Sequence, residues 1–208
     1  MAPKSYRTVA DEACETMIEK KSRFISTVRP VSTEAEALEL ISQMRSKYYD
    51  ATHNVYAYII GDGNIMRYSD DGEPSGTAGV PVLEVMRKEG LVDTAVVVTR
   101  YFGGIMLGAG GLVRAYSASA KLGIDAAGIV TRTLCDIVKI SCDYTDFGKV
   151  KYETLGGGYT VKDTIYGSGV DLYVYTKTDD TQKYIDKMCD TTNARAVCEI
   201  TGSEYADL

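Results

Sequence analysis

The chain has 208 residues, 45% of them hydrophobic, and a formal net charge of −6 at pH 7. This length lies between one and two domains, and the apolar fraction is ample for a folded core. A pI near 4.9 excludes a general attraction for nucleic acid phosphates, so RNA binding would need a local basic patch. Five cysteines without a CxxC pair argue against a disulfide framework or a thiolate zinc site.

The same composition bears on cellular location. The opening residues, MAPKSYRTVADEACETM, lack the apolar core of a signal peptide, and the longest aliphatic run, at 95–98, is far too short to cross a bilayer. We therefore expect a cytoplasmic protein, in a reducing environment, that makes no membrane contact.

Charge is unevenly distributed along the chain. Residues 1–134 carry 15 Lys and Arg against 16 Asp and Glu, whereas residues 135–208 carry 8 against 13.

The first two thirds of the chain are predicted to form strands, then a helix, then strands and helices in alternation. Thr33 and Glu36 have the spacing of a capping box, and the apolar residues that follow recur at helical intervals. GDGN at 61–64 is typical of a tight hairpin turn. The predicted elements are strands at 5–10 and within 14–30, a helix at 33–48, strands at 55–60 and 65–69, a helix at 81–90, a strand at 94–100 and a helix at 110–122 that stops at Gly123.

From residue 135 the pattern restarts as a smaller unit with the order βαββαβ. Its predicted elements are strands at 135–142, 159–166, 170–176 and 194–200 and helices at 145–155 and 179–189. This order predicts a ferredoxin-like domain, in which two helices cover one face of an antiparallel sheet. We therefore predict an α+β protein of two domains, residues 1–133 and 134–208.

The segment SDDGEPSGTAG at 69–79, called the acidic turn below, holds Asp70, Asp71 and Glu73 within four residues. Three close carboxylates repel one another unless a cation or hydrogen-bond donors intervene, so one interpretation is a Mg²⁺ or Ca²⁺ site. The other interpretation is structural: the aspartates cap backbone amides while the glycines allow a sharp entry into the next helix. The sequence leaves both open.

The segment FGGIMLGAGG at 102–111, called the glycine loop, runs from a strand end into a helix. Exposed amides at a helix N-terminus, with no Cβ to bar close approach, suit a phosphate or a carboxylate. Neither the Walker loop nor the GxGxxG fingerprint is met. Arg100 and Arg114 bracket the loop as candidate oxyanion ligands, and Tyr101 and Phe102 are candidates for base stacking. The alternative is that the arginines pair with the acidic turn and the glycines serve close packing.

His53, followed by Asn54, is the one histidine of the chain. A single histidine excludes HExxH chemistry and multi-histidine metal centres. No GxSxG or family-specific cysteine motif marks a nucleophile for which it would be the base. A structural or RNA-contacting role is therefore favoured over general base catalysis.

With these motifs, the chain resembles the IMPACT/YigZ family over almost its full length. The matching segments are EKKSRF (19–24), AT-HN (51–54), R-SDDGEPSGTAG-P (67–81) and VVTRYFGGIMLGAGGLVRAY (97–116). The resemblance implies an N-terminal domain similar to the βαβ fold of a ribosomal small-subunit protein domain, of the fourth domain of elongation factor G and of galactokinase-type kinases. It implies a second domain similar to the last domain of elongation factor G.

The resemblance also implies a link to translation. Eukaryotic relatives oppose activation of the kinase that phosphorylates initiation factor 2, by competing for its activator protein, and carry an additional N-terminal domain. This chain starts directly with the IMPACT segment, which favours a bacterial-type member.

The leading hypothesis is a non-enzymatic regulatory protein that binds RNA, the ribosome or a translation-control protein. The alternative is an enzyme for a phosphorylated or carboxylated small molecule, with Mg²⁺ at the acidic turn as its only candidate cofactor. A third option is a protein-interaction adaptor, and the oligomeric state stays open. The predicted contact residues are His53, Asn54, Arg67, Asp70, Asp71, Glu73, Arg100, Tyr101, Phe102, Gly103, Gly104, Gly108, Gly110, Gly111 and Arg114.

Overall fold

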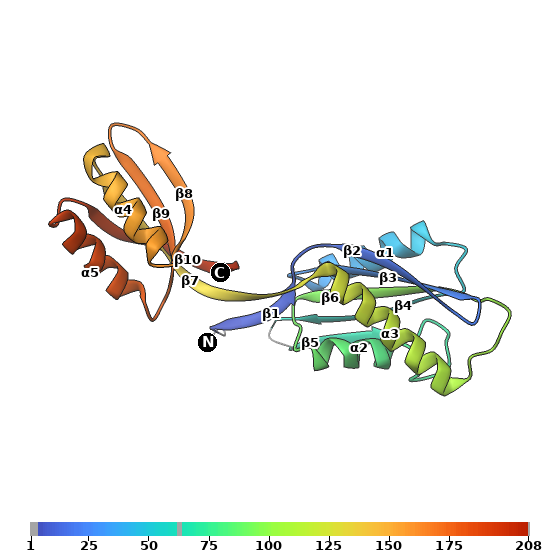
Figure 1. Cartoon of the computed structure of the whole chain (residues 1–208). Helices are drawn as coiled ribbons and strands as arrows, with labels where there is room; N and C mark the ends of the chain where they lie inside the picture. The colour runs from blue at the N-terminus through green and yellow to red at the C-terminus, as the bar shows by residue number, and fades with distance from the viewer. Residues whose placement is uncertain (1–3, 62–63, 208) are drawn as a thin grey trace. The chain divides into compact units, whose positions relative to one another are not determined.

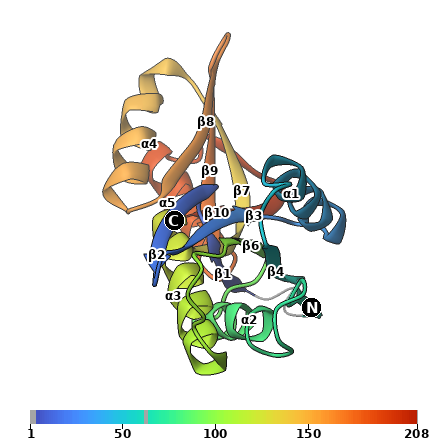
Figure 2. The same cartoon turned by 90° about the vertical axis from the view of Figure 1, so that its right-hand side faces the viewer.

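The computed structural model of the chain describes residues 4–61 and 64–207 (Figures 1 and 2). Its contacts divide into an N-terminal unit, Tyr6–Thr131, and a C-terminal unit made of Met1–Ser5 and Arg132–Leu208. Lys4 belongs with the C-terminal unit because its carbonyl accepts a hydrogen bond from the Leu134 amide. The described residues form two sheets and five helices, which confirms the predicted two-domain α+β fold.

The N-terminal unit is built on an antiparallel sheet with the strand order β2-β3-β6-β4-β5. Its strands are β2 (Ala13–Glu19), β3 (Ser22–Pro30), β4 (His53–Ile60), β5 (Ile65–Ser69) and β6 (Thr94–Tyr101). The register places Arg100 of β6 between Phe24 of β3 and His53 of β4. Residues from three separate parts of the chain therefore meet at this end of the sheet.

Helices cover both faces of this sheet (Figure 2). They are α1 (Glu34–Lys47) on one face and α2 (Gly79–Lys88) and α3 (Ala109–Ala127) on the other. The α1 face buries Leu40 with Val97, and the opposite face buries Tyr116 with Val98. Adjacent residues of β6 thus enter different cores, as the two-residue period of a strand requires.

The ends of α1 and α3 can be compared with the start and stop signals predicted from the sequence. The capping signal at Thr33 is confirmed, since its Oγ1 accepts a hydrogen bond from the Glu36 amide at 3.2 Å. The predicted stop at Gly123 is wrong, because α3 continues to Ala127. Gly123 is buried, and a Cβ built there would lie 2.4 Å from Oγ of Ser26. This glycine permits close packing of α3 on β3, and the helix ends at Gly128 with φ +71°.

The C-terminal unit has the ferredoxin-like order. Its elements are β7 (Ile129–Cys142), α4 (Tyr144–Gly156), β8 (Thr160–Tyr166), β9 (Val170–Lys177), α5 (Thr181–Thr192) and β10 (Val197–Asp207). The strand order is β10-β7-β9-β8, and β1 (Ser5–Val9) also pairs with β7. Tyr184 and Met188 of α5 pack with Val138, Leu172 and Val174 in a core separate from those of the N-terminal unit.

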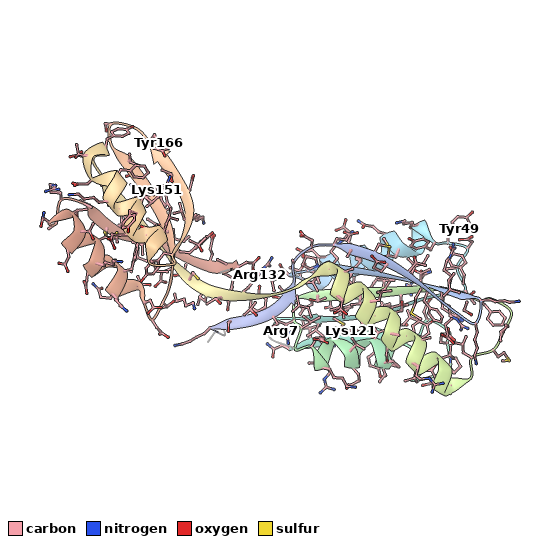
Figure 3. The ribbon with its side chains drawn as sticks, in the orientation of Figure 1. Arg7, Tyr49, Lys121, Arg132, Lys151 and Tyr166 are labelled. Atoms are coloured by element: carbon pink, nitrogen blue, oxygen red, sulfur yellow. The ribbon has the colours of Figure 1, made fainter. Side chains whose placement is uncertain are left out.

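Two further features complete the N-terminal unit. Arg7 and Lys121, both labelled in Figure 3, approach Glu89 at 3.7 and 3.3 Å and so connect β1, the end of α2 and α3. The predicted turn at 61–64 lies partly outside the described residues, although the Asn64 amide donates to the Gly61 carbonyl at 2.8 Å. Among the described residues, no helix is long and apolar enough to span a bilayer.

Candidate functional site

Asp70 of the acidic turn caps the N-terminus of α2. Its Oδ1 accepts hydrogen bonds from the amides of Gly79 and Ala78 at 2.8 and 3.1 Å, and its Oδ2 accepts one from Gly76 at 2.8 Å. The first amides of a helix have no partner within the helix, and a negative charge also stabilises the positive end of the helix dipole. The cap of α2 therefore explains why an acidic residue stands at position 70.

Asp71 holds the acidic turn on the edge of β4. Its Oδ2 accepts a hydrogen bond from the Asn54 amide at 2.6 Å, and its Oδ1 lies 2.8 Å from Nη2 of Arg45. Its carbonyl lies 2.8 Å from Nδ1 of His53, so the imidazole donates there. Asp71 has φ +43°, a left-handed conformation that Asp tolerates better than most residues.

Glu73 is the buried member of the three. Its Oε1 lies 2.6 Å from Nη1 of Arg100, which is 5% exposed, and accepts a hydrogen bond from the Tyr116 hydroxyl at 2.8 Å. Nε2 of His53 lies 3.7 Å away. Burial, and then the Glu73 charge, raise the pKa of Tyr116 well above its ordinary value, so this phenol stays protonated. Arg100, Glu73 and Tyr116 form a buried polar cluster between β6, the acidic turn and α3.

The three carboxylates therefore point to three different partners, and the capping interpretation of the acidic turn is confirmed. In the part of the chain that the structure describes, no group of three or more His, Cys, Asp or Glu side chains is placed to hold a metal ion. The Mg²⁺ interpretation gains no geometric support from this arrangement.

The first part of the glycine loop is fixed to the turn between β2 and β3. Oγ of Ser22 accepts hydrogen bonds from the Gly103 amide at 3.2 Å and from Nη2 of Arg100 at 3.3 Å. The Phe102 amide donates to Oγ1 of Thr52 at 3.1 Å. A Cβ built on Gly103 would lie 2.0 Å from the backbone carbon of Lys21, so only glycine allows this approach.

The rest of the glycine loop is open. Gly104 and Gly108 have φ of +81° and +73°, and no atom lies within 4 Å of a Cβ built at either residue. Among the described residues, no hydrogen-bond acceptor is found for the amides of residues 104–107 or for the first-turn amides of α3 at 109–111. These NH groups are therefore available to an external acceptor.

Basic and apolar residues lie on the segments that carry or adjoin these open amides, at the end of the unit where the β2–β3 turn meets the loop before α3 (Figure 1). The group, called the loop patch below, consists of Lys20, Lys21, Arg23, Phe102, Met106 and Arg114. Phe102 and Met106 are 48% and 87% exposed. Within residues 4–61 and 64–207, no carboxylate lies within ion-pair distance of Lys20, Lys21 or Arg114. The guanidinium of Arg23 lies over the ring of Tyr101, 4.4 Å from its centroid.

The structure separates the predicted contact residues into two groups. The residues of the acidic turn, His53 and Arg100 are engaged with one another, whereas the Phe102 side chain, Arg114 and the loop beyond Gly103 are accessible. Gly110 and Gly111 lie in the first turn of α3, where a Cβ built on Gly110 would lie 3.7 Å from Nη1 of Arg114 and one built on Gly111 would lie 2.9 Å from Cβ of Leu107.

Asn54 belongs with the first group, because its backbone amide donates to Asp71, while Tyr101 and Arg67 lie apart from both groups. Asn54 is buried and accepts a hydrogen bond from Thr99 at 2.7 Å, and the Tyr101 hydroxyl donates to Asp50 at 2.7 Å. Arg67 lies on the edge strand β5, 3.8 Å from Glu34 of α1. Its register partner is Tyr58, so about 16 Å of strand separates it from the His53 end of β4.

Sequence reasoning missed the contribution of Lys20, Lys21 and Arg23. The signal was present in the charged run EKKSR, whose two lysines adopt φ of +44° and +66° in the turn between β2 and β3. The close approach of Lys21 to Gly103 and the hydrogen bond from the Gly103 amide to Ser22 bring this turn to the glycine loop, and neither can be read from the sequence.

Comparisons with known proteins identify the family of both units. The model of the Impact N-terminal domain matches residues 20–124, and a domain of unknown function, DUF1949, matches residues 140–195. A solved structure described as "Crystal structure of an hypothetical protein" is similar over 97% of this chain and 100% of that chain, with a TM-score of 0.62 and 26% identity.

Among similar proteins, the IMPACT family member YvyE of Bacillus subtilis is 44% identical over 193 residues, 92% of this chain and 89% of that protein. The IMPACT family member YigZ of Escherichia coli is 35% identical over 128 residues, 60% of this chain and 63% of that protein. The Protein IMPACT homolog of Dictyostelium discoideum is 39% identical over 99 residues, 45% of this chain and 28% of that protein. The chain therefore belongs to the IMPACT family.

Proposed function

We propose that the chain is a non-enzymatic, cytoplasmic regulatory protein linked to translation, and that it binds RNA, free or in the ribosome, through the loop patch. Membership of the IMPACT family supports a role related to the regulation of translation. The observation that carries the RNA proposal is the combination of open backbone amides with three cationic side chains that have no carboxylate partner among the described residues.

This combination suits a nucleic acid backbone. Lys and Arg side chains and backbone NH groups are the usual protein contacts to phosphate oxygens. The half-exposed ring of Phe102 offers a surface for base stacking, and the guanidinium of Arg23 offers a second flat surface. The low pI of the whole chain does not oppose this, because residues 135–208 carry −5 of the net charge of −6.

The enzyme alternative has less support. In that hypothesis a carboxylate of the acidic turn binds Mg²⁺ or moves a proton, but Asp70 and Asp71 are occupied by backbone amides and Glu73 by Arg100. No observation favours catalysis over binding.

Binding of the purified chain to ribosomes and to single-stranded RNA, measured across a range of salt concentrations, tests the proposal. We expect the logarithm of the affinity to fall linearly with the logarithm of the salt concentration. The reason is that Lys and Arg side chains release condensed counterions from the phosphates when they bind, and added salt opposes that release. The double variant Lys20→Gln/Lys21→Gln is expected to weaken binding by about tenfold and to reduce the salt slope by about 2. Arg114→Gln is expected to reduce the slope by about 1.

The matched control is Arg87→Gln/Lys88→Gln, which removes two exposed charges from the far end of α2. It is expected to leave both affinity and slope unchanged. Absence of RNA and ribosome binding at low salt contradicts the proposal. If the wild-type chain binds neither RNA nor ribosomes but retains a protein partner, it is a protein-interaction adaptor instead.

A further inference from the structure

The C-terminal unit contains a cavity of about 460 Å³ between its helices and the edge of its sheet. The loop between α4 and β8, the end of β9 and the start of α5 form its walls. The side chains that matter for its chemistry are Tyr159, Tyr175, Lys177, Asp180 and Lys183. This volume is within the range of cavities that hold small ligands, roughly 300–1,000 Å³.

The cavity is locally basic in a unit that is acidic. Residues 135–208 carry 8 Lys and Arg against 13 Asp and Glu, yet Lys177 and Lys183 both line the cavity. In the described part of the chain neither ammonium group has a carboxylate within ion-pair distance. By contrast, Lys139, Lys162 and Lys187 of the same unit are each paired with an acidic side chain. The cavity lining therefore carries two unpaired lysines against one carboxylate, that of Asp180.

Two tyrosine rings are held in place beside these lysines. The ring of Tyr159 lies against that of Tyr184, with 4.3 Å between centroids. The hydroxyl of Tyr175 donates to Glu204, and Nζ of Lys162 lies 5.5 Å from the centre of its ring. Because other contacts fix both rings, a flat ligand could pack against them without a large cost in side-chain entropy.

The backbone next to the rings is also open. Gly158 has φ +76°, and no atom lies within 4 Å of a Cβ built on it. A Cβ on Gly157 would lie 2.8 Å from the ring of Tyr159, so glycine at this position keeps the ring in place. At the start of α5 no side chain caps the first-turn amides, which adds donors to the two lysines.

We propose that this cavity binds a small phosphorylated molecule with a flat ring, of the class of a nucleoside monophosphate. Lys177 and Lys183 contact the phosphate, the tyrosine rings contact the base, and the carboxylate of Asp180 accepts hydrogen bonds from sugar hydroxyls. This site is separate from the loop patch and gives the C-terminal unit a role as a sensor of a small metabolite. The inference does not depend on RNA binding.

Titration of the full-length ¹⁵N-labelled chain with adenosine monophosphate, inorganic phosphate and adenosine tests the site. We expect the nucleotide to shift the amide signals of Gly157, Gly158 and Thr160. Phosphate or adenosine alone is expected to bind at least about tenfold more weakly, because each makes only part of the contacts.

Two charge-matched double variants decide the role of the lysines. Lys177→Gln/Lys183→Gln is expected to raise the Kd for the nucleotide by at least about tenfold. Lys149→Gln/Lys151→Gln, which removes two exposed lysines of α4 outside the cavity, is expected to change the Kd by less than about twofold. All four lysines are exposed, so both variants should fold, which their amide spectra verify.

Two results overturn the inference. One is the absence of shifts at these amides with millimolar nucleotide. The other is an equal loss of affinity in the two double variants, which would show that net charge alone attracts the ligand.

Discussion

The acidic turn and the glycine loop are two polar, glycine-rich segments at the same end of one sheet, and they use their polar groups in opposite ways. The three carboxylates of the acidic turn all accept hydrogen bonds from the chain itself. The glycine loop beyond Gly103 leaves a series of amides without an acceptor among the described residues. A polar group is thus a candidate for ligand binding only where the fold does not already supply its partner.

The two segments are joined through Arg100. Its guanidinium contacts Glu73 of the acidic turn, while Ser22 links it to the Gly103 amide. The acidic turn therefore supports the glycine loop through Arg100, and our proposal assigns no ligand contact to its carboxylates. Substitutions in the turn should act mainly on stability, and substitutions in the loop patch mainly on binding.

The largest effect is expected for Glu73→Gln. Removal of one charge from a buried ion pair leaves the other uncompensated, which costs about 3–5 kcal/mol. Urea unfolding followed through NMR signals of the N-terminal unit measures this loss. Asp125→Asn, which neutralises an exposed carboxylate of α3, is the control, with an expected cost below about 1 kcal/mol. Equal losses of unfolding free energy in the two variants would show that burial of the Arg100 charge does not require the Glu73 carboxylate.

Asp70→Ala is expected to have the next largest effect. It removes the acceptor of the amides of Ala78 and Gly79, two buried residues at the start of α2, at a cost of about 2–3 kcal/mol. Ser75→Ala, at an exposed position of the same turn, should cost less than about 0.5 kcal/mol. Thermal or urea unfolding compares the two, and a stability of Asp70→Ala equal to that of the control would remove the capping role.

The sequence was sufficient to predict features that depend on neighbouring residues. The cap at Thr33 and the βαββαβ order of the C-terminal unit are examples, because each follows from spacing along the chain. Among the features of the N-terminal unit, the end of α3 was mispredicted because the reason for Gly123 lies in a contact with Ser26 on a distant strand.

The sequence could not predict which residues of the candidate site are engaged with one another and which are accessible. Arg100 and Tyr101 are adjacent, but the strand sends Arg100 towards Glu73 and Tyr101 towards Asp50 on the opposite face. Which carboxylate reaches Arg100 is decided by the register of β6 with β3 and β4, a long-range property. For the same reason EKKSR could be recognised as a charged run, but its place beside the glycine loop could not.

A third test separates glycines that serve packing from glycines that serve access. Gly103→Ala places a methyl group against the backbone of Lys21 and is expected to cost about 2 kcal/mol. Gly110→Ala, in the first turn of α3 with only the Arg114 guanidinium nearby at 3.7 Å, is expected to stabilise the chain by about 0.5 kcal/mol. Unfolding experiments measure both. Destabilisation by Gly110→Ala equal to that by Gly103→Ala would mean that both glycines are required by the fold.

The smallest effect is expected for Asp71→Asn. Asparagine tolerates the left-handed conformation at φ +43° and retains an acceptor for the Asn54 amide, so the substitution removes little more than the attraction to Arg45. That ion pair is about half-exposed on its arginine side, and we expect a cost near 0.5 kcal/mol. A double-mutant cycle with Arg45→Gln measures the coupling directly, and a value below about 1 kcal/mol is expected. A coupling as large as the cost of Glu73→Gln would mean that the exposed Asp71–Arg45 pair stabilises the fold as much as the buried Glu73 carboxylate does. The contrast between exposed and buried carboxylates of the acidic turn would then disappear.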